Sequence, residues 1–185
     1  MDFLVDPTAD TTIVQKRSHE DASIAIMSPN LKFRYYAVYD GHGSRDGLTE
    51  NHVTTALLRG YRSLRPLHYY VKYEIDAVLR NGFSSQGIKE AIRKAFLNFD
   101  EIAYREKCVA GSCATVLVII QQGGMNYLYS ANLGDSRTLI WTPNSNAEKS
   151  VIYSTQDQTP RDEAEATRIL QAGGNVFLNR VNGML

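Results

Sequence analysis

The sequence of 185 residues lacks three features that would each have indicated a class of protein. It has only two cysteines, Cys108 and Cys113, which are too few for a disulfide framework. Its longest apolar run, Ala114 to Ile120, is far shorter than the roughly 18 residues that a membrane-spanning helix needs. Its 20 basic residues are balanced by 20 acidic ones, so no basic surplus indicates binding to nucleic acid or to an anionic membrane surface. These absences favour a globular protein with reduced thiols, which we expect in the cytoplasm or the nucleus.

The start of the chain, MDFLVDP, is acidic and lacks the basic and apolar regions of a signal peptide. The length is that of one domain of ordinary size. Apolar residues make up 43% of the sequence, which is near the globular average and excludes a disordered tail.

Short segments rich in β-branched and aromatic residues predict strands near both ends of the chain. The predicted strands are residues 11–14, 22–27, 33–39, 113–120, 126–131, 136–141, 151–154 and 175–180. The run 113–120 is almost continuously apolar, which indicates a central strand buried on both faces. The pair Gly123-Gly124 predicts a hairpin into the next strand.

Apolar residues recur at helical spacing between about 88 and 104. Further helices are expected over about 48–58, within 61–87, and over 163–170. The pair Gly173-Gly174 is expected to end the last of these helices. Helices between early and late strands predict an α+β fold, an antiparallel β-sandwich flanked by helices.

Acidic residues lie beside two of the predicted strands, in the pair Glu20-Asp21 and in the string Asp40-Gly41-His42-Gly43. Carboxylate and carbonyl oxygens are the ligands that Mg²⁺ and Mn²⁺ prefer, and a histidine with a pKa near ~6.5 can protonate a leaving group. On spacing alone the signal is weak, because an Asp-Gly after a strand is most often a turn and a Glu-Asp pair is most often solvated.

The order of several segments carries more information than their spacing. Together they resemble the signature blocks of the type 2C metal-dependent protein serine/threonine phosphatases, and they cover most of the chain outside about residues 44–105. The blocks are KRSHED (16–21), YAVYDGHG (36–43), GSCAT (111–115), ANLGDSR (131–137), QDQTP (156–160) and the residues from Glu165 to Gly183.

The resemblance implies a β-sandwich with two or more Mg²⁺ or Mn²⁺ ions at one end. Asp40 would bridge two ions, Gly41 would supply its backbone carbonyl, and Glu20 would reach an ion directly or through water. Asp21 would support the same metal site from beside Glu20. Asp157 would lie near an additional, weaker metal position.

The resemblance also implies the reaction. A metal-bridged hydroxide would attack the phosphorus of a phosphoserine or phosphothreonine in a protein substrate, and His42 would protonate the departing oxygen. The phosphate would be held by Arg17 or Lys16; the family's arginine stands four residues before the glutamate, where this chain has Lys16. Asp135 and Arg137 are expected to be structural.

The chain departs from the family pattern in three further ways. His19 replaces a usual methionine, and Gln158 replaces a usual histidine. The family also supplies two metal-binding aspartates downstream of the Arg-Val-Asn-Gly block, and the sequence ends at Leu185 before either.

We therefore expect residues 1–185 to form a single phosphatase-like domain truncated at its C-terminal side, with the C-terminal strands missing. Such a chain would be inactive alone and a monomer when complete. The alternative is a catalytically inactive phosphatase-like binding or scaffold module.

Overall fold

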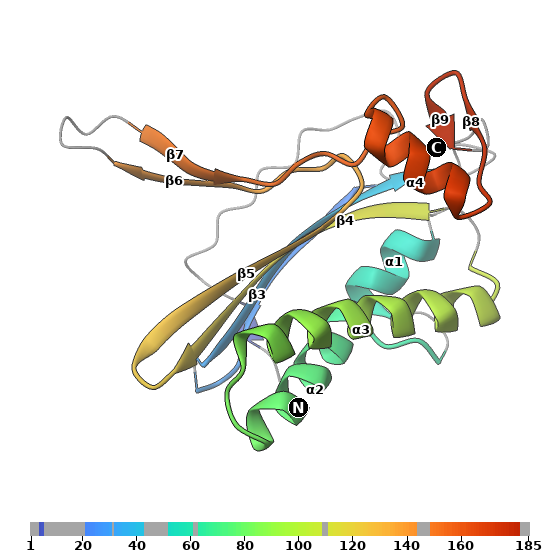
Figure 1. Cartoon of the computed structure of the whole chain (residues 1–185). Helices are drawn as coiled ribbons and strands as arrows, with labels where there is room; N and C mark the ends of the chain where they lie inside the picture. Colours follow the sequence, from blue (N-terminus) through green and yellow to red (C-terminus); the bar gives the residue numbers. More distant parts are fainter. Residues whose placement is uncertain are drawn as a thin grey trace.

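The computed structural model describes residues 4–5, 21–30, 32–42, 52–60, 63–108, 111–143 and 149–181. Its elements are β1 (Leu4–Val5), β2 (Ala22–Met27), β3 (Phe33–His42), α1 (His52–Arg59), α2 (Leu67–Arg80), α3 (Ser85–Arg105), β4 (Gly111–Gln122), β5 (Met125–Leu133), β6 (Leu139–Pro143), β7 (Lys149–Ser154), α4 (Glu163–Gln171), β8 (Val176–Phe177) and β9 (Arg180–Val181). Helices α2 and α3 lie on one side of the main sheet, and the β6–β7 hairpin lies on the other (Figure 1). None of the helices in the described ranges is both long and apolar enough to cross a membrane.

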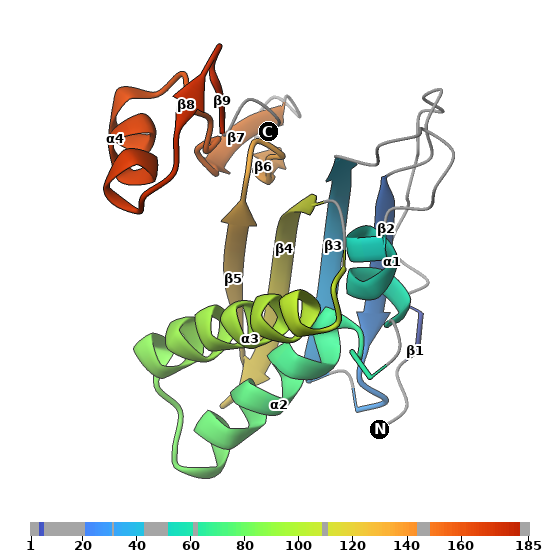
Figure 2. The same cartoon turned by 90° about the vertical axis from the view of Figure 1, so that its right-hand side faces the viewer.

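The main sheet has five antiparallel strands in the order β1-β2-β3-β4-β5, which Figure 2 shows with the helices in front. Strands β3 and β4 pair over ten residues, from Phe33 opposite Ile120 to His42 opposite Gly111. The sequence predicted that the strand would end at Tyr39 and be followed by a tight loop. This was wrong, because Asp40, Gly41 and His42 all pair with β4 and continue the strand.

One face of the sheet forms the core. The alternate residues Phe33, Tyr35, Ala37 and Tyr39 of β3 are buried, as are their neighbours at every second position of β4. These side chains pack in one cluster with the apolar stripes of α2 and α3. Burying one large apolar side chain contributes about 1.5–3 kcal/mol, so this face supplies much of the stability of the described chain.

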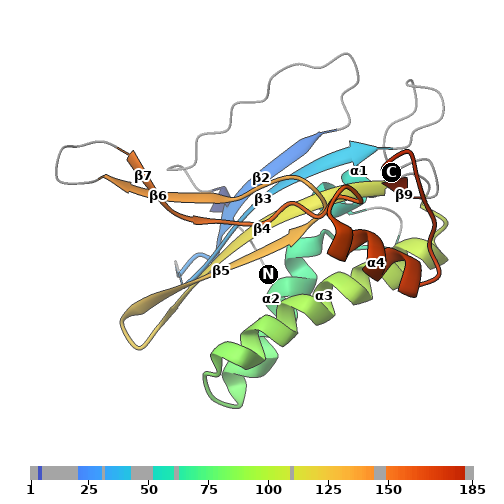
Figure 3. The ribbon, with the colours of Figure 1, turned by 45° about the horizontal axis from the view of Figure 1, so that its top comes forward.

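The opposite face is less covered than the sequence predicted. On β4, Leu117 and Ile119 are only partly buried, and on β3 the side chain of Val38 is 48% exposed. The prediction of a strand buried on both faces was therefore wrong for β4 in the described structure. The reason is that both long helices pack on one side of the sheet, opposite the β6–β7 hairpin (Figure 3). On that hairpin the side chains of Trp141 and Ile152 are themselves exposed.

The helices predicted from periodicity are confirmed, with shifted ends. Helix α3 begins three residues earlier than expected, where the Ser84 hydroxyl accepts a hydrogen bond from the Gly87 amide. Helix α4 begins after Asp162, whose carboxylate accepts from the Glu165 amide. The first part of the helix expected over 48–58, and the strand expected over 11–14, lie outside the described residues.

Two late strands differ from their predicted ranges. Strand β6 starts at Leu139 rather than at residue 136, because the Thr138 amide donates to the Thr155 hydroxyl instead of to a neighbouring strand. The segment 175–180 is not one strand but a tight hairpin, in which Leu178 and Asn179 take positive φ between β8 and β9.

Candidate active site

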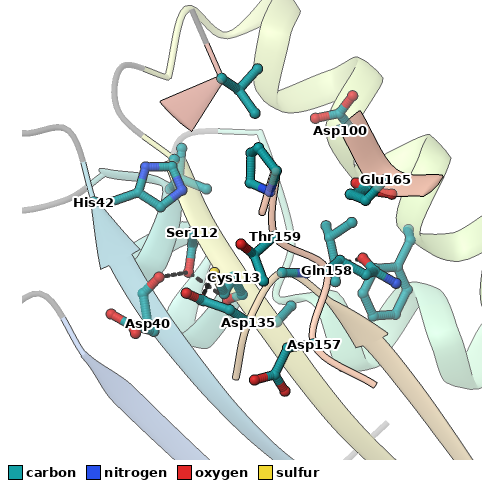
Figure 4. Close-up of a pocket in the computed structure, with 18 of the residues that line it drawn as sticks. Asp40, His42, Asp100, Ser112, Cys113, Asp135, Asp157, Gln158, Thr159 and Glu165 are labelled. Atoms are coloured by element: carbon teal, nitrogen blue, oxygen red, sulfur yellow. Dashed lines mark hydrogen bonds between the residues drawn. The ribbon is translucent and has the colours of Figure 1, made fainter. Parts of the chain in front are cut away.

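A cavity of about 930 Å³ opens at the end of the sheet where β3 stops (Figure 4). Strands β3 and β4 contribute one wall, with Asp40, His42 and residues 111–114. The turn after β5 and the segment 157–161 contribute another, and α4 and the β8–β9 hairpin close the cavity. Titratable groups from separate parts of the chain therefore meet in one place.

Asp40 and His42 lie two residues apart on β3, so both project from the face opposite the helix-packed core. The first residue of β2, Ala22, pairs with Tyr39. Asp21 directly precedes this first paired residue, just as Asp40 directly follows Tyr39. Two of the carboxylates that the sequence singled out therefore lie at the same end of the neighbouring strands β2 and β3.

Ser112 links β4 to the backbone of β3 beside Asp40. The Ser112 hydroxyl lies 3.2 Å from the carbonyl oxygen of Asp40 and 2.8 Å from that of Cys113, so it can donate its single hydrogen to either oxygen. Ser112 belongs to the GSCAT block, but the motif alone predicts no role for its hydroxyl. Its contact supports the backbone next to Gly41, the residue whose carbonyl is a candidate metal ligand.

The ring of His42 lies directly over the backbone of Gly111, its partner on β4. A Cβ atom built on Gly111 would come within 2.1 Å of His42 Cε1. Any side chain at position 111 would displace the imidazole, so the glycine determines where the ring lies.

The thiol of Cys113 donates a hydrogen bond to Asp135 Oδ1 at 3.4 Å. Burial raises the pKa of this thiol, and the negative charges of Asp135 and Asp40 add to the effect, which keeps the sulfur protonated near neutral pH. Gly134 takes φ +96°, and a Cβ there would lie 2.3 Å from the sulfur, so only glycine lets the turn after β5 approach β4 this closely. Asp135, expected from the sequence to be structural, lies on the cavity wall.

Asp157 also lines the cavity, and Arg137 holds its carboxylate with two hydrogen bonds. These hydrogen bonds lower the pKa of Asp157 below its ordinary value. Next to it, Gln158 accepts from the Gly134 amide at 3.1 Å and donates to the Asn132 carbonyl at 3.2 Å. Gln158, which stands where the family usually has a histidine, therefore holds the turn that carries Asp135 through two hydrogen bonds.

Three sequence-predicted site residues, Lys16, Arg17 and Glu20, lie outside the described residues. Within the described ranges, no group of three or more His, Cys, Asp or Glu side chains lies close enough to hold a metal ion. Of the sequence-predicted metal ligands, the described residues include Asp21, Asp40, Gly41 and Asp157.

Residues 7–185 match the family model described as Protein phosphatase 2C. The chain belongs to the protein phosphatase 2C family. The resemblance drawn from the motifs is therefore confirmed at the level of the family.

Curated relatives agree with this protein phosphatase 2C assignment. Protein phosphatase ppm-1.A of Caenorhabditis elegans is 31% identical over 94% of this chain and 35% of its own length. Protein phosphatase 1B of Rattus norvegicus is 33% identical over 90% of this chain and 41% of its own length. Probable protein phosphatase 2C 2 of Paramecium tetraurelia is 31% identical over 92% of this chain and 53% of its own length. The chain spans about a third to a half of the relatives that it matches.

A solved structure described as that of a C. elegans sex determining protein superposes with a TM-score of 0.60. It is 24% identical in sequence, and the match covers 91% of this chain and 39% of that one. This likeness confirms the predicted fold class of helices packed on antiparallel sheet.

The donors fit the metals expected for a protein phosphatase 2C. The described candidates are carboxylate oxygens and a backbone carbonyl, which suit the hard cations Mg²⁺ and Mn²⁺.

Proposed function

We propose that this protein hydrolyses phosphoserine and phosphothreonine esters in proteins, using two or more Mg²⁺ or Mn²⁺ ions at the end of β3. One observation carries the proposal: Asp40 and His42 project from the same face of β3 and both line one cavity, and Asp21 directly precedes the neighbouring strand β2. A metal ligand and a proton donor are thus within reach of one substrate.

In this proposal Asp40, the Gly41 carbonyl and Glu20 hold the ions, and Asp21 supports them from the start of β2. Bound there, the ions supply charge neutralisation and a water that is nucleophilic near neutral pH. The Ser112 hydroxyl restrains the Asp40 backbone and so keeps the adjacent Gly41 carbonyl in place.

His42 is the proposed general acid. A serine or threonine alkoxide is a poor leaving group, and a proton delivered to its oxygen accelerates departure by ~10²–10⁴. Because the ring lies on Gly111, its orientation is set by β4 rather than by substrate.

Other proposed roles concern the phosphate and the outer part of the site. Arg17 or Lys16 binds the phosphate oxygens, with the arginine suited to two parallel hydrogen bonds. Asp157 lies near a weaker metal position, and each of its carboxylate oxygens keeps a further lone pair for a metal beside its hydrogen bond with Arg137.

The retention of Asp40, Gly41 and His42 argues against the alternative of an inactive scaffold module, because a scaffold has no physical need for this cluster. Cys108 and Cys113 are free thiols, which supports a reducing compartment, the cytoplasm or the nucleus.

The substitution Asp40→Asn tests the proposal. In the full-length protein it should abolish Mn²⁺-dependent phosphate release from a phosphoserine peptide. In the 185-residue chain it should weaken Mn²⁺ binding, measured by calorimetry, at least tenfold. Glu163→Gln, on the exposed first turn of α4, is the control and should change neither. Wild-type turnover by the Asp40→Asn protein would refute the site assignment.

A further inference from the structure

A second cavity, of about 1000 Å³, lies between α3 and the last strand of the main sheet. We call it the α3–β5 groove. One face of α3 from Lys89 to Asp100 forms one wall, and residues 128–133 of β5 form the other. Ile140 of β6 and Tyr153 of β7 close its remaining side.

The groove exposes large apolar side chains. Leu97 of α3 is 52% exposed, and Leu128 and Leu133 of β5 are 45% and 53% exposed. Large apolar side chains exposed along a hollow of this kind mark a site of contact with another molecule. The hydroxyl of Ser130, on the β5 wall, is buried and has no hydrogen-bond partner among the described residues.

β5 is the last strand in the sheet order, and no described strand pairs with its outer edge (Figure 2). Such an edge presents backbone amide and carbonyl groups that can pair with an added extended segment. The groove contains six consecutive residues of β5, from both of its faces, so it follows this edge.

The charges on the α3 wall distinguish its two ends. Lys89 and Arg93 lie one helical turn apart, and neither forms an ion pair with a described residue. Asp100 stands at the other end of the wall. An occupant that complements this pattern carries a carboxylate at the Lys89 end.

The groove adjoins the cavity of the candidate active site, because Phe96, Asp100 and Leu133 line both. From Lys89 to Asp100 the helix wall is about 16 Å long at 1.5 Å per residue. From Leu128 to Leu133 the strand wall is about 17 Å long at ~3.4 Å per residue. Both lengths match about five residues of extended polypeptide.

We propose that the α3–β5 groove binds an extended segment of the phosphoprotein substrate, a proposal that rests on the function proposed above. Apolar side chains of this segment contact Leu97 and Leu128. An Asp or Glu about five residues from the mouth of the catalytic cavity pairs with Lys89 and Arg93. The preferred substrates are therefore sites flanked by an extended apolar sequence that ends in acidic residues.

The test uses a fluorescent, unphosphorylated peptide with alternating leucines and two terminal aspartates, so that binding is separate from catalysis. Its affinity for the 185-residue chain is measured by fluorescence anisotropy at low salt. Lys89→Glu, Arg93→Glu and Leu128→Asp should each weaken binding about tenfold. Lys32→Glu, the same charge change at an exposed residue away from the groove, is the matched control and should bind like wild type.

A peptide with lysines in place of the aspartates should bind at least tenfold more weakly. The proposal is overturned if both peptides bind alike, or if Lys89→Glu and Arg93→Glu bind like wild type. It is also overturned if Leu128→Asp abolishes self-association in sedimentation while the peptide does not bind, because the groove is then an interface between copies. Phosphate release from a short phosphoserine peptide that cannot reach the groove, measured on the full-length protein, tests the proposed function separately.

Discussion

The guanidinium group of Arg137 forms a bidentate ion pair with the carboxylate of Asp157, with Nε 2.8 Å from Oδ1 and Nη2 2.7 Å from Oδ2. The pair joins the segment after β5 to the segment after β7, twenty residues apart in the chain. Both oxygens of a candidate metal-site carboxylate are thus engaged by a cation of the same chain.

Replacing Arg137 should raise the pKa of Asp157, because the arginine's hydrogen bonds are what lower it. Since the folded-state pKa lies below the unfolded value of ~3.9, the pair's contribution is present above that pH and is lost as the pH falls through the lower folded value. We expect Arg137→Ala to return the Asp157 pKa toward ~3.9 in an NMR titration. Arg137→Lys should recover only part of the shift, since an ammonium group cannot make both bonds in the same plane. An unchanged pKa in Arg137→Ala would contradict the pairing.

The proposed acid role of His42 predicts selectivity by leaving group. In the full-length protein, His42→Gln should slow phosphoserine hydrolysis by ~10²–10⁴, whereas p-nitrophenyl phosphate hydrolysis should fall clearly less because p-nitrophenolate departs without a proton. Gly111→Ala should reproduce this pattern, because its Cβ would occupy the place of the imidazole. Initial rates on the two substrates measure the difference. Equal losses on both would leave His42 with a positional role only.

His68, in the first turn of α2, should make stability depend on pH. Its side chain is 5% exposed, and burial lowers its pKa from about 6.5 to about 4. The neutral form is favoured in the folded state, so its contribution is complete above pH ~6.5 and is lost as the pH falls toward 4. By linkage the loss is on the order of 3 kcal/mol.

Urea unfolding at pH 7.5 and pH 4.5 measures this loss. Because other groups also titrate over this range, the informative quantity is the difference between wild type and His68→Phe. The variant should retain its stability better at the lower pH. Parallel losses in both proteins would refute the assignment to His68.

The incompletely covered face of the sheet should cause the 185-residue chain to self-associate. Val38 on the sheet and Trp141 and Ile152 on the hairpin are exposed apolar side chains, and surfaces of this kind favour association. Ile152→Lys or Val38→Lys should raise the concentration at which light scattering increases. Tyr73→Lys, an equally drastic change at an exposed residue of α2, is the control and should have no such effect. A monomeric wild-type chain at high concentration would contradict this expectation.

The sequence by itself determined the local elements and the family. The aromatic and β-branched residues of β3, the almost continuous apolar run of β4 and the helical spacing on α3 are local patterns, and they predicted elements that the structure contains. The ordered blocks around Asp40 identified the family because their residue types and order are readable without coordinates.

The tertiary structure alone decided which residues meet across the fold. That Gly111 supports His42, that Arg137 engages Asp157, and that Gln158 clamps the turn before Asp135 all depend on strand register and on contacts between distant segments. The same holds for burial: an apolar strand such as β4 has the same sequence pattern whether one face or both are covered. Only one face of β4 is fully buried, because α2 and α3 both pack on that side of the sheet. The burial of a strand's face depends on where other elements pack and not on the strand's own residues.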